Sequence, residues 1–234
     1  MCVLFLAGCG EKKPVSARMP APPPPITAAP APLPPRSEKS SSPAITVPPD
    51  AVPLFTETGM ASWYGPPYHN RQSSNGETYD MNAMTAAHRT LPLNSVVRVT
   101  NLRSGAATVV RITDRGPFVE GRVIDLSLAA AKAIDVWRPG TAPVKLDVLD
   151  TPASLESGGR WCVQIGAFHQ QIAAEELRER LSRRYLTAKV LDFPSPAGDW
   201  WVRVRVLDDD RRRAEEVTRD THPDEGSAFL VRLD

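Results

Sequence analysis

Three carboxylates and one histidine stand at predicted turns or strand ends, where side chains that do chemistry are usually placed. Glu77 ends the turn Asn75-Gly-Glu77, and Asp114 closes a strand-like run directly before an arginine. Asp125 precedes a predicted helix, and His88 follows two alanines. Carboxyl groups and an imidazole are the groups that general acid–base chemistry uses most often. These residues are therefore the first candidates for an active site.

Each candidate also has a purely structural interpretation. Asp114 could pair with Arg115 or Arg111 or accept turn N–H groups, and Glu77 could be a solvated loop carboxylate. Asp125 could stabilise a helix start through the helix dipole. His88 could be a half-buried histidine with satisfied ring nitrogens. The spacing alone does not show whether these groups converge in space.

The elements that must position these residues are short strands. Runs rich in β-branched residues predict strands at 61–64, 95–100, 107–113 and 143–148. Ser127 is a suitable N-cap for a short helix over 128–134. Many short strands with one or two helices favour a small β-barrel, in a mainly β or α+β chain.

The rest of the chain alternates strands and helices. Strands are predicted at 161–167, 187–193, 200–206 and 227–233, and helices at 170–185 and 211–219. The order βαββαβ predicts a four-stranded sheet with both helices on one face. The valines of 161–167 and 200–206 share the face that must meet the helices.

The opposite face of this sheet is then expected to be open. It carries Gln164, Trp201, Arg203 and Arg205. An exposed tryptophan among hydrogen-bonding side chains suits a sugar-binding surface, because the flat ring packs on a pyranose and the donors reach its hydroxyl groups. The alternative is that Trp201 packs under the linker or a crossing segment.

Composition excludes several classes of function. More than half of the 24 prolines lie between Pro14 and Pro53, so this stretch cannot bury a core and is expected to be a disordered tether. The 28 basic and 27 acidic residues give a net charge of +1, which argues against a nucleic-acid partner. No apolar run is long enough for a membrane span, and no Cys/His grouping has metal-ligand spacing. We expect no metal and no cofactor.

The N-terminal residues Leu6-Ala-Gly-Cys9 resemble the lipobox of bacterial lipoproteins, in which the cysteine receives a diacylglycerol. The resemblance implies lipidation of Cys9. The stretch before Cys9 is short and has no basic residue, so we expect the true start to lie upstream. Gly10 after the cysteine is not the Asp that usually marks inner-membrane retention, so the resemblance implies the outer membrane, with the chain facing the periplasm.

The longer motifs resemble a known family. Gly59-Met-Ala-Ser-Trp-Tyr-Gly65, Met84-Thr-Ala-Ala-His-Arg-Thr-Leu-Pro92, Asp114-Arg-Gly-Pro-Phe118 and Arg122-Val-Ile-Asp-Leu-Ser127 are similar to rare lipoprotein A. That family implies a double-psi β-barrel and a lytic transglycosylase of the division septum. Trp161-Cys-Val-Gln-Ile-Gly-Ala-Phe168 and Trp201-Val-Arg-Val-Arg-Val206 resemble the SPOR repeat, which implies peptidoglycan binding.

The resemblance divides the chain and assigns roles. Residues 1–9 form a lipoprotein signal remnant, 10–58 the tether, 59–150 the barrel, 151–159 a flexible linker and 160–234 the SPOR domain. The catalytic acid is expected at Asp114, supported by Glu77 and His88, with Asp125 as a possible additional acid. The residues expected to bind substrate are Trp63, Tyr64, Asn75 and Arg115, with Gln164, Trp201, Arg203 and Arg205 on the SPOR domain.

Cleavage of naked glycan strands with 1,6-anhydro ends is the function that these features favour. The expected partners are denuded peptidoglycan, a membrane reached through the lipid, and divisome proteins. The alternatives are a non-catalytic peptidoglycan-binding protein and an expansin-like protein that loosens glycan contacts. RNA binding by the open sheet is disfavoured by the near-neutral charge and the expected envelope location.

Overall fold

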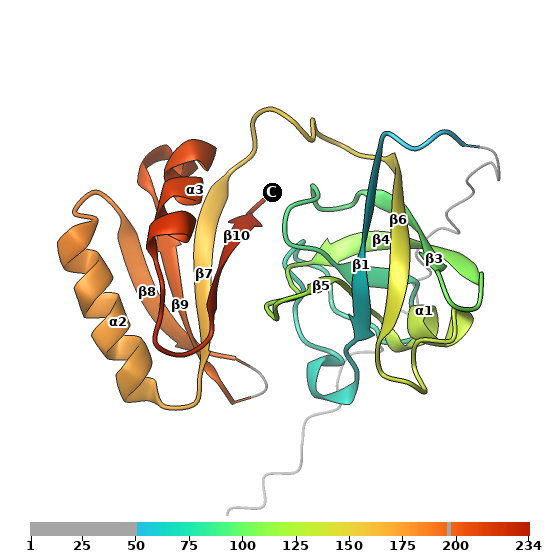
Figure 1. Ribbon diagram of the computed structural model, residues 1–234, viewed down its shortest axis with the longest axis horizontal. Coiled ribbons are helices and arrows are strands. Elements are labelled where there is room, and N and C mark those ends of the chain that lie inside the picture. The colour runs from blue at the N-terminus through green and yellow to red at the C-terminus, as the bar shows by residue number, and fades with distance from the viewer. Residues whose placement is uncertain (1–50, 196–197) are drawn as a thin grey trace, which may run out of the picture. The chain divides into compact units, whose positions relative to one another are not determined.

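The computed structural model describes residues 51–195 and 198–234 (Figure 1). Cys9, the lipobox and most of the Pro-rich tether lie outside the described residues. Within them, no helix is long and apolar enough to cross a membrane. The same residues hold no cluster of three or more His, Cys, Asp or Glu side chains suited to a metal ion.

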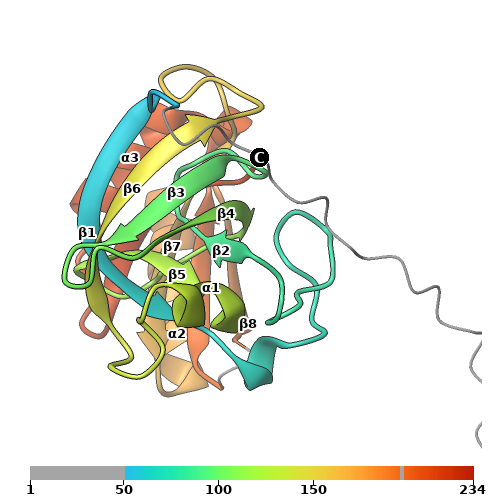
Figure 2. The same cartoon turned by 90° about the vertical axis from the view of Figure 1, so that its right-hand side faces the viewer.

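The first domain is a closed barrel of six strands in the order β1-β5-β2-β4-β3-β6. Two of its strand pairs, β1 with β5 and β2 with β4, are parallel. Figure 2 shows β1, β6 and β3 side by side along one part of the barrel wall. The strands are β1 (Phe55–Trp63), β2 (Thr85–Ala87), β3 (Val96–Asn101), β4 (Ala107–Asp114), β5 (Arg122–Leu126) and β6 (Ala142–Asp150).

Alternation of apolar and polar residues explains why these strands close around one core. In β3, Val97 and Val99 are fully buried while the intervening Arg98 is not. Val110 and Ile112 of β4 follow the same period. The helix α1 (Leu128–Ala133) covers part of this core, and Ser127 caps it by accepting from the Ala130 N–H at 3.1 Å. The predicted strands and the predicted N-cap are confirmed.

The barrel begins earlier than expected. β1 starts at Phe55, within the segment 10–58 that the expected division of the chain assigns to the tether. Phe55 pairs with Val148 of β6, and Glu57 pairs with Leu146. The expected boundary at residue 59 is therefore wrong, because pairing with β6 draws four more residues into the sheet.

The second domain is a sheet in the order β10-β7-β9-β8 with both long helices against one face (Figure 1). The valines and isoleucine of β7 and β9 meet Leu177, Leu181 and Val217 of the helices in one buried cluster. The predicted βαββαβ order is confirmed. The elements are β7 (Trp161–Phe168), α2 (Gln171–Arg184), β8 (Lys189–Pro194), β9 (Trp200–Arg205), α3 (Arg211–Asp220) and β10 (Ser227–Arg232).

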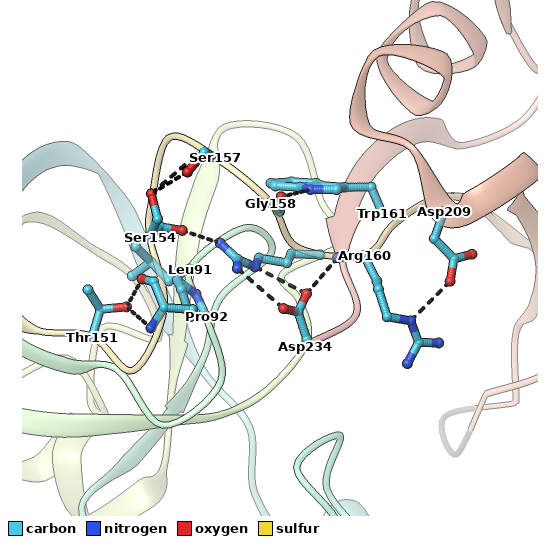
Figure 3. A network of polar contacts seen from close by, with 12 residues as sticks. Leu91, Pro92, Thr151, Ser154, Ser157, Gly158, Arg160, Trp161, Asp209 and Asp234 are labelled. Atoms are coloured by element: carbon cyan, nitrogen blue, oxygen red, sulfur yellow. Dashed lines mark hydrogen bonds and ion pairs between the residues drawn. The ribbon is translucent and has the colours of Figure 1, made fainter.

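The segment between the domains is held by hydrogen bonds instead of hanging free as a flexible linker (Figure 3). The Trp161 indole donates to the Gly158 carbonyl at 3.0 Å. The buried Arg232 guanidinium donates to the Ser154 carbonyl at 2.8 Å, and its Nε lies 3.2 Å from an Asp234 carboxylate oxygen. The Arg160 N–H donates to the same carboxylate at 2.7 Å. These contacts bind the segment to the last strand of the chain.

Candidate active site

Asp114 and Asp125 lie on two strands that flank the short strand β2. Ala87 of β2 pairs with Asp114 of β4 on one side and with Asp125 of β5 on the other. Directly paired residues point to the same face of a sheet, and neighbouring strands are about 4.8 Å apart, so the two Cα atoms are roughly 10 Å apart. The methyl group of Ala87 leaves the space between the two carboxyl groups open.

Asp114 is fixed by three donors on one oxygen. Its Oδ1 accepts from the Ser74 N–H at 3.0 Å, the Ser74 hydroxyl at 2.5 Å and the Arg115 N–H at 2.8 Å. The Arg115 guanidinium donates to the carbonyls of His88 and Leu91. Of the structural alternatives for Asp114, acceptance of turn N–H groups is therefore observed. Oδ2 is left as the oxygen that a ligand can reach.

Asp125 has a different environment. Its carboxyl group is largely buried and lies 3.4 Å from the Arg122 guanidinium. Burial raises the pKa of Asp125, and it outweighs the opposing effects of Arg122 and of a hydrogen bond from Ser62. A buried carboxyl group with a raised pKa keeps its proton to a higher pH than an ordinary aspartic acid does.

Both carboxyl groups line one cleft of about 490 Å³. Its barrel side is rich in aromatic rings. The Tyr64 ring stacks on Tyr79 with centroids 4.3 Å apart, and Tyr68 meets Tyr64 edge-on at 5.9 Å. Other barrel residues that line the cleft include Arg71, Gln72, Ser74, Arg115, Phe118 and Arg122. Aromatic faces beside hydrogen-bonding groups suit a carbohydrate.

Glu77 and Asn75 lie outside this cleft. Arg111 donates to both oxygens of Glu77, at 3.0 and 2.7 Å, and about half of the Glu77 side chain is exposed. The hydrogen bonds from Arg111 lower the pKa of Glu77. The Asn75 amide donates to Asn94 at 3.2 Å. The expected place of Glu77 in the cleft is therefore wrong, because Arg111 holds it on the outer surface of the turn.

His88 is buried behind the cleft instead of facing it. Its Nδ1 accepts from the N–H groups of Thr90 and Leu91 at 3.2 and 3.1 Å, which leaves Nε2–H to donate to Glu57 at 3.1 Å. Burial lowers the pKa of His88. Its carbonyl accepts from the Arg115 guanidinium at 3.0 Å. His88 is thus placed to fix the loop that carries Arg115, and its ring does not face the cleft.

Two further predicted substrate-binding residues differ in position. Trp63 packs against the barrel core and does not line the cleft. Arg115 does line it, although its guanidinium donates to the Leu91 carbonyl at 2.7 Å and to the Asp234 carbonyl at 2.6 Å. Burial lowers the pKa of Arg115 to about 10. Of the residues predicted on the barrel, the structure gathers Tyr64, Asp114, Arg115 and Asp125 around the cleft.

The sheet face expected to be open in the second domain is covered. Gln164 and Trp201 are only 3% and 7% exposed. Trp201 shares its face with Cys162, Phe229 and Val231, and Phe118 of the barrel lies 5.2 Å from the Trp201 ring. The predicted exposure of Trp201 is wrong because this apolar cluster is removed from water by the barrel loop after Asp114.

The two arginines of this face are engaged with neighbouring side chains. The Arg203 guanidinium donates to Gln164 Oε1 at 2.7 Å and lies over the Phe193 ring at 5.0 Å. Arg205 donates to Asp209, which also accepts from Arg160. Neither arginine lines the cleft, whereas Gln164 and Trp201 do.

Sequence reasoning missed several residues of the cleft. Ser74 and Arg122 contact the two aspartates. Ser74 stands in a loop, and Arg122 begins a family motif in which only Asp125 was given a role. Tyr68 and Tyr79 reach the cleft from the segment before β2. Their signal was the cluster of tyrosines near Tyr64, which composition alone did not connect with Asp114.

The comparisons with known proteins agree with this architecture. Residues 56–146 match the lytic transglycolase domain family, and residues 157–221 match the SPOR domain family. The endolytic peptidoglycan transglycosylase RlpA of Campylobacter jejuni is 43% identical over 149 residues, and that of Vibrio cholerae is 59% identical over 95 residues. The chain is thus similar to the RlpA proteins. Its fold is accordingly a double-psi β-barrel followed by a SPOR domain.

These alignments are partial. They cover 53% of this chain and 54% of the Campylobacter protein, and 41% of this chain and 36% of the Vibrio protein. The chain thus matches about half the length or less of these curated relatives. Among solved structures, a Clavibacter michiganensis expansin covers 76% of this chain and 90% of its own, with 13% identity and a TM-score of 0.35.

Proposed function

We propose that the protein is a lytic transglycosylase that cleaves peptidoglycan glycan strands, with a preference for strands that lack stem peptides. The observation that carries this proposal is the pair Asp114 and Asp125 on one cleft, one fixed by donors and exposed to ligand, the other buried with a raised pKa. Two carboxyl groups in different environments are the usual catalytic groups of enzymes that break a glycosidic bond. The names of the curated relatives support the same substrate class.

The proposed reaction consumes no water. Asp125 donates its proton to the glycosidic oxygen as the bond to the anomeric carbon breaks and positive charge develops on that carbon. Asp114 takes the proton of the muramic C6 hydroxyl, whose oxygen forms the new bond to the anomeric carbon. The products are a 1,6-anhydro end and a new free hydroxyl on the leaving sugar. The proton balance is restored when the two carboxyl groups exchange a proton through solvent.

The test is to incubate the full chain with peptide-free sacculi and to analyse the soluble products by mass spectrometry. The wild-type protein should release fragments with 1,6-anhydro ends. Asp114→Asn should lower the rate at least about 100-fold, since general acid–base catalysis contributes about that much or more. Asp135→Asn is the matched control, because Asp135 is exposed at the end of α1 with a positive φ that asparagine also adopts.

The outcomes separate the competing functions. Products with a reducing end would indicate a hydrolase, and binding without any product would indicate a peptidoglycan-binding or expansin-like protein. Full activity of Asp114→Asn would exclude Asp114 from the chemistry. Loss of activity in Asp135→Asn would point to instability as the cause in both variants.

We also propose that a lipid on Cys9 anchors the protein in the outer membrane, with the folded domains in the periplasm at the division septum. The support is the lipobox resemblance together with the SPOR domain. One acyl chain binds a membrane only reversibly, whereas the two of a diacylglycerol give stable anchoring. Cys9→Ser, expressed with a complete signal sequence, should move the protein from the membrane fraction to the soluble periplasmic fraction. Unchanged fractionation would contradict the proposed anchor, and Cys162→Ser, which alters a buried thiol, is the control.

A further inference from the structure

The cleft that holds the two aspartates has a second wall, which belongs to the SPOR domain. Three neighbouring strands of its sheet contribute to the lining: β7 with Gln164 and Ala167, β9 with Trp201 and β8 with Phe193. Gln164 pairs with Arg203 in the ladder, and Phe193 pairs with Trp201, so Gln164, Trp201 and Phe193 form one patch. The SPOR sheet face is therefore part of the same cleft as the carboxyl groups.

Specific contacts hold this wall against the barrel. The Arg232 N–H donates to the Arg89 carbonyl at 3.0 Å, and the Leu93 N–H donates to the Asp234 carbonyl at 3.2 Å. The Ser227 hydroxyl donates to Glu120 at 2.7 Å. Backbone hydrogen bonds of this kind fix the register of β10 and the residues after it on the barrel loops. The wall is therefore attached to the catalytic domain on the side of β10, next to β7.

The patch has the chemistry to hold a sugar. Arg203 occupies the Gln164 carbonyl oxygen, so the Gln164 amide NH₂ is the group left to donate to a ligand. Phe193 and Trp201 line the cleft beside it, although Phe118 covers most of the Trp201 ring. Across the cleft stand the tyrosines of the barrel and the two carboxyl groups. A sugar with an acetamido group offers both an apolar ring face and a carbonyl acceptor, which match the chemistry of these two walls.

We infer that the two domains bind one glycan segment between them, and that Gln164 positions the sugar that Asp114 and Asp125 act on. This inference rests on the proposed function and deepens it, because it makes the SPOR sheet a part of the substrate cleft. A SPOR domain that acted only as a separate anchor would leave cleavage of short soluble strands unaffected by changes at Gln164.

The experiment measures kcat and KM of the full chain on short, soluble, peptide-free glycan strands. Gln164→Glu keeps the size of the side chain and its bond with Arg203 but replaces the NH₂ donor with an acceptor. We expect KM to rise at least about tenfold with kcat little changed, which is the pattern of lost substrate binding. Gln171→Glu is the matched control, since Gln171 is exposed at the start of α2, and it should behave as wild type.

A second variant guards against misfolding. Gln164→Asn keeps the donor but shortens it, and it should give a smaller rise in KM than Gln164→Glu at an equal melting temperature. If wild type cleaves these strands and both variants keep its KM, the shared cleft is wrong and the proposed function stands. If wild type neither cleaves nor binds the strands, the proposed function itself fails and this inference falls with it.

Discussion

At the scale of single residues, Asp114 and Asp125 differ in what surrounds their carboxyl groups. Asp114 receives two donors from Ser74, a residue of the loop before β2, and one from its neighbour Arg115. Asp125 is buried beside Arg122, and burial raises its pKa. This difference favours Asp125 as the group that arrives protonated at the glycosidic oxygen and Asp114 as the group that accepts a proton.

Asp125→Asn tests this division of roles. Asparagine keeps the shape of the side chain but cannot donate the proton, so kcat should fall at least about 100-fold. In the wild-type protein the rate should fall as the pH rises through the raised pKa of Asp125, because only the protonated form donates. The residual activity of the variant should lack this decline. A variant with the wild-type rate and pH profile would assign the acid to another residue.

At the scale of elements, the pair His88 and Glu57 joins β1 to the residue that follows β2, across the intervening strand β5. The neutral imidazole donates one N–H to the carboxylate and accepts two backbone N–H groups. The hydrogen bond from His88 lowers the pKa of Glu57, while burial lowers that of His88. The pair therefore stabilises the loop behind Asp114 while the His88 imidazole is uncharged.

The stability of the protein should consequently depend on pH. As the pH falls through the ordinary histidine value of 6.5, the unfolded chain takes up a proton that the buried His88 does not. The free energy of unfolding should then decrease by up to about 1.4 kcal/mol per pH unit, until His88 itself is protonated. Denaturant melts of His88→Gln should lack this decrease, although their baseline stability is lower. His169→Gln, at a largely exposed position, should keep the wild-type dependence. An unchanged dependence in His88→Gln would show that another group is responsible.

Elements with a clear period could be predicted from the sequence, and short ones could not. β3, β4 and β6 alternate over enough residues to show a buried face, and the second domain shows both its helices. β2 has only three residues and β5 only five, too few for a period. These two strands are the ones that bring Asp114, Ala87 and Asp125 into register. The sequence therefore identified each aspartate as a candidate but could not predict that the two lie on one cleft.

The hydrogen-bond partners of His88 and Glu77 could not be predicted from the sequence either. Glu57 lies in the segment 10–58 that the expected division of the chain assigns to the tether, so nothing in the sequence connects it with His88. Arg111 pairs with Glu77 across 34 positions of the chain, which no local pattern reveals. The motif resemblance identified Glu77 and His88 as site residues, whereas their contacts place one on the outer surface of the turn and the other behind the cleft.

At the scale of the whole molecule, periodicity predicted which residues share the second face of the SPOR sheet but not what covers it. That face carries Trp201, Phe229 and Val231, which are costly to leave in water. The period of a strand is a property of one sheet, whereas the covering residue, Phe118, belongs to the other domain. The apolar character of the face was the available signal that it would be covered.

Phe118→Ala should therefore weaken the coupling between the two domains. Its ring lies 5.2 Å from Trp201 and 5.9 Å from Phe229, and truncation exposes both. We expect calorimetry to show one cooperative transition for the wild-type protein and two for the variant, with a loss of about 2 kcal/mol, less than for a fully buried phenylalanine. Phe55→Ala is the matched control, because Phe55 is 45% exposed at the start of β1 and should leave a single transition.

Because Phe118 follows directly on the loop that holds Asp114 and Arg115, Phe118→Ala should also raise KM for glycan strands. A single unchanged transition would mean that the hydrogen bonds of Arg232 and Asp234 suffice to couple the domains without this ring.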